Sequence, residues 1–127
     1  MSIAVDLDAL REELAAHERP AYLATAGTEG APHVVSAYLR WVDGRFEAEC
    51  GRTTAANLAV RPSVSLVVPP NEVGGYSLIV DARAEVVGGG EGEPPTARLT
   101  PTKAVLHRPA EAPGQAGSCG HDCVPVG

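Results

Sequence analysis

The sequence predicts a mostly β fold, a small antiparallel β-barrel with an N-terminal helix and one short helix between strands. Much of the chain between residues 21 and 107 alternates apolar and polar residues with a period of two, which is typical of half-buried strands. Turns rich in Gly, Pro and Asp separate these segments. Short strands in a flat sheet would leave open edges, and closing the sheet removes most of them.

A helix is expected near the beginning of the chain. Asp6 can cap it, because a short acidic side chain there accepts hydrogen bonds from the first helical N–H groups. Leu7, Leu10 and Leu14 then fall three and four residues apart, which places them on one helix face. The helix is expected to end before Pro20.

The expected strands follow the helix. The first covers residues 21–25, and a turn over 27–30 leads to the second at 33–42. Asp43-Gly44 is a strong hairpin signal, because both central residues of a type I′ turn need positive φ. The remaining strands are expected at residues 45–50, 63–68, 76–87 and 97–107. The last is the weakest, since Pro101 requires an edge position or a bend.

The segment that follows the third strand is the most informative about function. The strand turns through Gly51 and Arg52 into a short helix that begins with two threonines. A helix N-terminus carries unpaired N–H groups and a partial positive charge, and Arg52 adds a planar donor fork. In an acidic protein this anion site points to a phosphate-bearing small molecule. The alternative is a capped helix beside a solvated arginine.

Composition excludes several classes of function. The net charge is −6 and no basic tract occurs, which argues against nucleic acid as the main partner. No apolar run approaches the roughly 20 residues that span a bilayer, so no membrane segment is expected. The first residues lack the pattern of a signal peptide, and we expect a cytoplasmic protein. At 127 residues the chain is large enough for one core.

Residues 110–127 are rich in Pro and Gly, and we expect a flexible tail after a domain at 1–109. Cys119, His121 and Cys123 lie close together in this tail. Two thiolates and an imidazole could bind zinc or another thiophilic metal with a further ligand from elsewhere. A disulfide, a redox-active thiol pair and incidental cysteines in a disordered tail remain alternatives.

Several stretches together resemble the pyridoxamine 5′-phosphate oxidase-like, FMN-binding split barrels. They are residues 21–25 with 30–35, Asn57-Leu58 with 61–66, and 76–86. The resemblance covers roughly residues 18–87, with fainter agreement to about 109. It implies that 1–109 is a split-barrel flavin-binding domain and that the protein is a homodimer. The cofactor, FMN or the deazaflavin coenzyme factor 420, would then lie in a groove between subunits.

The resemblance also implies which residues contact the cofactor. Its phosphate would lie at Arg52, Thr53, Thr54 and Asn57. Its ring would lie at His33, Val34, Val35 and Ser36. Many members of the family have a lysine where this chain has a threonine at position 54, so another group has to supply that charge. The arginine-rich C-terminal segment of the true pyridoxamine phosphate oxidases has no counterpart here, and that activity is not expected.

The function expected from these observations is that of a flavin- or deazaflavin-dependent oxidoreductase that acts on an unidentified small molecule. No catalytic residue can be assigned. The alternative is a non-catalytic module that binds a flavin or haem for storage, sensing or delivery, and a ligand-free structural barrel is a third interpretation. His33 and His107 are the candidate haem-binding or catalytic histidines, with a structural role as the alternative for each.

Overall fold

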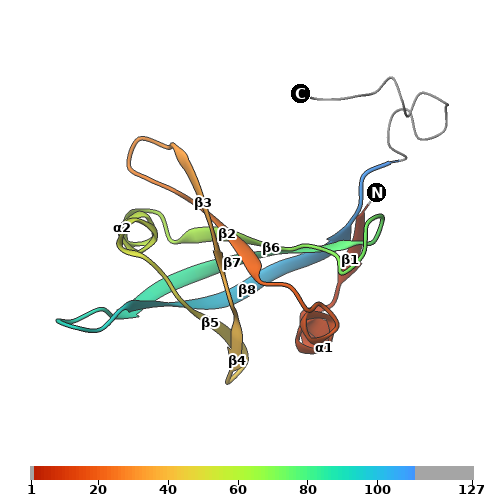
Figure 1. Cartoon of the computed structure of the whole chain (residues 1–127), viewed down its shortest axis with the longest axis horizontal. Coiled ribbons are helices and arrows are strands. Elements are labelled where there is room, and N and C mark those ends of the chain that lie inside the picture. Colours follow the sequence, from red (N-terminus) through yellow and green to blue (C-terminus); the bar gives the residue numbers. More distant parts are fainter. Residues whose placement is uncertain (1, 111–127) are drawn as a thin grey trace.

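The computed structural model of the protein describes residues 2–110. The predicted metal cluster of Cys119, His121 and Cys123 lies outside the described residues. Two helices and one 3-10 turn accompany the strands of the described part (Figure 1). The elements are β1 (Ser2–Val5), the 3-10 turn η1 (Leu7–Ala9), α1 (Leu10–Ala15), β2 (Ala21–Ala26), β3 (Pro32–Ala37), β4 (Arg40–Val42), β5 (Arg45–Glu49), α2 (Arg52–Val60), β6 (Ser63–Val68), β7 (Ser77–Gly88) and β8 (Pro95–His107).

The strands form an antiparallel sheet in the order β3-β2-β6-β7-β8-β5-β4, and β1 pairs with β8. The two strands at the ends of this order, β3 and β4, are consecutive in the chain and are separated only by Tyr38 and Leu39. The segment 32–42 therefore leads from one edge of the sheet to the other, and the sheet curls into a barrel (Figure 1). The single strand expected at 33–42 breaks at this corner, because one straight strand cannot border both edges.

The last strand is present as predicted, and it is longer and more fully paired than its sequence indicates. β8 is 13 residues long and lies inside the sheet, paired with β7 on one side and with β5 and β1 on the other. Pro101 pairs with Ala82 where the register shifts between Asp81 and Ala82, so the chain uses a bend instead of an edge position. The strand β1 was not predicted, because four residues acquire their extended form from pairing with β8 rather than from a local pattern.

The local turn and cap signals are confirmed. The Asp6 carboxylate accepts a hydrogen bond from the Asp8 N–H at 3.1 Å, at the beginning of η1. Asp43 and Gly44 have φ of 50° and 81°, as a type I′ turn requires. The predicted N-terminal helix is therefore present, although its first turn is 3-10.

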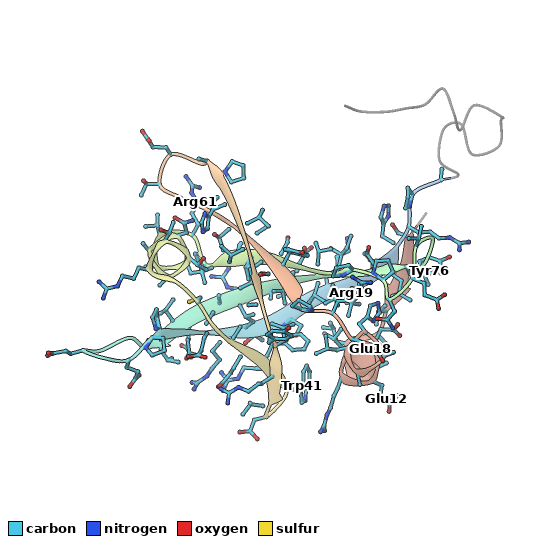
Figure 2. All side chains as sticks on the ribbon, in the orientation of Figure 1. Glu12, Glu18, Arg19, Trp41, Arg61 and Tyr76 are labelled. Carbon is cyan, nitrogen blue, oxygen red and sulfur yellow. The ribbon has the colours of Figure 1, made fainter. Side chains whose placement is uncertain are left out.

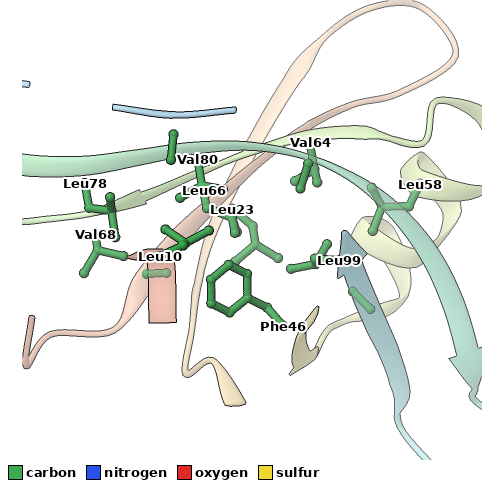
Figure 3. Close-up of a cluster of buried hydrophobic side chains, with 14 residues drawn as sticks. Leu10, Leu23, Phe46, Leu58, Val64, Leu66, Val68, Leu78, Val80 and Leu99 are labelled. Atoms are coloured by element: carbon green, nitrogen blue, oxygen red, sulfur yellow. The ribbon is translucent and has the colours of Figure 1, made fainter. Parts of the chain in front are cut away.

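The core fills the inside of the barrel and is made of side chains from the strands and both helices (Figure 3). Phe46 is fully buried, and Trp41 packs against it edge to face with ring centroids 4.8 Å apart. Leu10 from α1 and Leu58 from α2 are buried in the same cluster, so both helices are attached to the barrel by apolar contact. The mostly β barrel with minor helices is the fold that the sequence predicts.

Candidate functional site

A cleft of about 460 Å³ lies between β3 and the first turn of α2. It brings together three segments that are separate in the sequence. The lining residues are His33, Val35 and Ser36 from β3, Glu49, Cys50 and Gly51 at the end of β5, and Arg52, Thr53 and Thr54 from α2. The cleft thus joins the predicted anion site to most of the predicted ring-contacting stretch.

The N-terminus of α2 is open toward an anion. Gly51 is the N-cap in an extended conformation and provides no side-chain cap, and the first turn contains no acidic residue. The Ala55 N–H donates to the Gly51 carbonyl at 3.0 Å, which is the first bond of the helix. The three preceding N–H groups, of Arg52, Thr53 and Thr54, therefore have no acceptor within the helix, and they carry its partial positive charge.

The side chains of this first turn differ in their access to the cleft. Arg52 and Thr53 are exposed, and Arg52 makes no ion pair with any residue in the range 2–110. Thr54 is only 1% exposed, so its side chain is turned into the protein and its backbone N–H is the group left for a ligand. The Thr54 hydroxyl is therefore not a donor for the cleft, and among the described residues that line it Arg52 is the only arginine or lysine.

Two residues of the predicted site lie outside the cleft. Val34 is 59% exposed and is not among the residues that line the cleft. Asn57 lies more than a turn further along α2, and its Nδ2 donates to the Thr25 hydroxyl at 3.1 Å. The Asn57 side chain is thus engaged within the protein.

Two cleft residues were missed by the sequence analysis, Glu49 and Cys50. Burial raises the pKa of the Cys50 thiol, so the thiol is protonated at neutral pH. Glu49 adds a negative charge to the same cleft, which favours a ligand whose anionic group stays at the helix end. Both residues directly precede Gly51 at the end of β5. Their position next to the predicted anion site is the sequence feature that could have identified them.

The two candidate histidines differ in position. His33 is half-buried and lines the cleft. His107 lies at the end of β8, where its Nδ1 is 3.1 Å from the Ser2 hydroxyl of β1, and it is not part of the cleft. Within residues 2–110, no three His, Cys, Asp or Glu side chains are placed to hold a metal ion. No helix in this range is long and apolar enough to cross a membrane.

Comparison with known sequences identifies the same family as the residue pattern. Residues 7–107 match the family described as pyridoxamine 5′-phosphate oxidase. Uncharacterized proteins from Mycobacterium bovis and Mycobacterium tuberculosis are each 46% identical over 78 residues, which is 58% of this chain and 54% of theirs. The chain therefore spans about half the length of the curated relatives it matches.

Solved structures share the fold at low sequence identity. An F420 reductase has a TM-score of 0.63 at 17% identity, over 73% of this chain and 94% of its own. The haem storage protein HutZ from Vibrio cholerae has 0.61 at 20%, over 80% and 94%. A FAD-binding protein from Mesorhizobium loti has 0.64 at 18%, over 84% and 96%. These likenesses show that the fold is the split barrel of this family.

Proposed function

Because the chain belongs to the pyridoxamine 5′-phosphate oxidase family, we propose that it binds FMN, or the deazaflavin coenzyme factor 420, in the cleft between β3 and α2. We propose further that it is an oxidoreductase for a small molecule. The observation that carries the proposal is the uncapped N-terminus of α2, with the exposed Arg52 beside it, in a cleft that also contains β3. Both coenzymes carry a phosphate, which is the anion that such a helix end binds best.

The phosphate is held at the helix end. Three backbone N–H groups at the start of α2, the Thr53 hydroxyl and the Arg52 guanidinium are the donors available there. Guanidinium matches phosphate geometry through two parallel N–H bonds, which makes Arg52 the residue with the largest single contribution. Among the described residues, no other arginine or lysine lines this cleft.

The ring of the coenzyme lies along β3. This strand is at the end of the sheet order, so within the described part of the chain its outer backbone edge has no strand partner. Edge N–H and C=O groups are free to bond the polar pyrimidine side of a flavin, as they would bond another strand. N–H groups at this position also stabilise negative charge on the ring. His33, Val35 and Ser36 provide the adjoining side chains.

The coenzyme supplies hydride-transfer chemistry when it is bound. The chain binds the coenzyme, orients it and sets the electrostatics around it. The Cys50 thiol is protonated at neutral pH, so it lines the cleft as an uncharged group and does not act as a nucleophile. No acid–base pair is assigned, and the substrate stays open.

The second candidate function is non-catalytic binding of a flavin or haem for storage, sensing or delivery. The likeness to the haem storage protein HutZ supports it at the level of the fold. The specific observation is that His33, a common type of haem ligand, is half-buried in the cleft. Tight binding without turnover is what distinguishes this function from the first.

A fluorescence titration of the purified protein with FMN and with the deazaflavin, together with its absorbance spectrum as isolated, tests the proposal. Saturable binding of either coenzyme is expected, and the tighter ligand identifies the cofactor. Steady turnover with a reductant and an acceptor then supports the oxidoreductase. A Soret band without flavin binding would replace it with the haem-binding function, tested further by His33→Ala.

A further inference from the structure

Two side chains attach α2 to the β2–β3 hairpin. Asn57 lies in the helix, and Arg61, four residues later, is its C-cap. Asn57 donates from Nδ2 to the Thr25 hydroxyl at 3.1 Å. Arg61 donates from Nε to the Gly27 carbonyl at 2.8 Å and from Nη2 to the Thr28 carbonyl at 3.2 Å. Figure 2 shows Arg61 between α2 and this hairpin. These three hydrogen bonds are called the hairpin clamp below.

The clamp is closely fitted at Gly27. A Cβ atom at this position would lie 3.1 Å from the Asn57 Oδ1, which is tighter than nearly all such contacts. The Gly27 carbonyl accepts from Arg61 and also from the Gly30 N–H at 2.9 Å, within the turn itself. The turn and the helix are therefore in direct contact, and the clamp holds a turn that already has its own hydrogen bond.

The clamp acts on the cleft through the strand register. Thr25 of β2 is the cross-strand partner of His33 of β3, and His33 lines the cleft. The opposite wall of the cleft is the first turn of the same helix that carries Asn57. The side chains of Asn57 and Arg61 thus hold the hairpin against α2. The N-terminus of α2 faces β3, which is the second strand of that hairpin.

From this arrangement we propose that Asn57 and Arg61 are positioning residues, which set the separation of β3 from the N-terminus of α2 and touch no ligand. The FMN titrations that test this role rest on the proposed function, since they take FMN as the ligand of the cleft. The proposal assigns Asn57 a role different from the phosphate contact that the family resemblance implies. It also assigns a role to Thr25, which does not line the cleft.

A double-mutant cycle with FMN titrations separates positioning from contact. Asn57→Ala removes the donor, and Thr25→Val removes the acceptor while it keeps a β-branched side chain of similar volume. Each is expected to weaken FMN binding about tenfold, and the double variant no more than either single one, because all three lose one hydrogen bond. Thr25→Ser keeps the hydroxyl and should keep the affinity. A loss in Asn57→Ala with none in Thr25→Val would overturn the proposal and make Asn57 a direct contact.

Arg61 needs a control for its charge, since any cation favours an anionic ligand. Arg61→Lys keeps the charge and loses the fork that reaches two carbonyls. We expect Arg61→Lys to weaken FMN binding nearly as much as Arg61→Gln, by about the same factor at low and at high salt. Wild-type FMN affinity in Arg61→Lys would show that the positive charge at residue 61, and not its hydrogen bonds, favours FMN binding. It would overturn the positioning role of Arg61.

Two further measurements are needed. One distinguishes loss of the clamp from a general loss of stability, and the other tests the clamp without any ligand. Val68→Ala makes a cavity at the end of β6 away from α2 (Figure 3), and it should lower Tm without changing FMN affinity. In the ligand-free protein, Asn57→Ala and Arg61→Gln should speed amide hydrogen exchange in residues 27–31 and leave the β6–β7 pairing unchanged. If the wild type binds neither FMN nor the deazaflavin, the proposed function fails. Hydrogen exchange in the ligand-free protein still tests the clamp, because unchanged exchange at the hairpin overturns it.

Discussion

Thr54 and Arg52 lie in the same first turn of α2 but differ in what they offer to the cleft. Thr54 is buried and its side chain is turned into the protein, so it brings no charge to the cleft. The positive charge of the cleft comes from Arg52, two residues earlier, which is exposed. A guanidinium binds phosphate as a fork rather than as a point charge, which suits Arg52 to the phosphate proposed for this cleft.

Arg52→Ala should weaken FMN binding by about 1–3 kcal/mol, because it removes a charge-assisted hydrogen-bond donor. The measurement is the dissociation constant by flavin fluorescence. Arg11→Ala is the matched control, since Arg11 is an exposed arginine on α1 and its loss changes the net charge equally. An unchanged dissociation constant in Arg52→Ala, or an equal loss in both variants, would contradict the assignment.

Cys50 should react slowly with iodoacetamide at neutral pH, because burial raises the pKa of its thiol and the thiolate is the reactive form. Its alkylation should accelerate as pH rises above the ordinary range of a thiol, and bound FMN should slow it several-fold. Since the folded-state pKa is the higher one, the stability linked to this proton is present below the unfolded pKa and is lost as pH rises toward the folded pKa. Mass spectrometry of the Cys50 peptide gives the rate.

Equal alkylation rates of Cys50 in the folded and the urea-unfolded protein would contradict its burial. Equal rates with and without saturating FMN would place the ligand elsewhere.

At the scale of elements, the strands predicted from alternation are present wherever the pattern is local. The exceptions are pairings between distant segments. β1 exists because β8 provides its partner, and the bend at 38–39 exists because one segment has to border both edges of the sheet. β8 was expected to be weak because of Pro101, yet pairing on both sides outweighs one missing N–H donor.

The same distinction applies to the candidate site. Arg52 and Thr53 were found from local sequence, because a strand, a glycine and a helix start are consecutive in the chain. The engagement of Asn57 with Thr25 was not found, since its partner is 32 residues away and no local pattern encodes the side of the helix that faces β2. Val34 is expected at the ring only because the family resemblance identifies a whole stretch of strand, and this stays a prediction.

The attachment of α1 to the barrel depends on Leu10, the fully buried residue of that helix. Leu10→Ala should lower the free energy of unfolding by about 2–5 kcal/mol, since it leaves a cavity in the core. Leu7→Ala, at a residue that is 40% exposed, is the control and should cost less than about 1 kcal/mol. Urea unfolding measures both, and similar costs for the two variants would contradict the role of Leu10.

The molecule as a whole leaves apolar surface next to its open cleft. Tyr22 and Val34 are 44% and 59% exposed on the outer side of the β2–β3 hairpin. A second subunit would cover this surface and the ring side of the cleft, as expected from the family. We therefore predict a homodimer, with a mass by sedimentation of twice the 13.1 kDa of one chain. Val34→Glu should produce monomers, and a monomeric wild type would contradict an intersubunit cofactor site.

We propose that the cleft at the N-terminus of α2 holds the phosphate of a flavin. Parallel fluorescence titrations of the wild type with FMN and with riboflavin, which lacks the phosphate, test it most directly. FMN should bind at least about tenfold more tightly, because only FMN can use the open N–H groups and Arg52. Equal affinities for FMN and riboflavin would show that the phosphate does not bind at the N-terminus of α2.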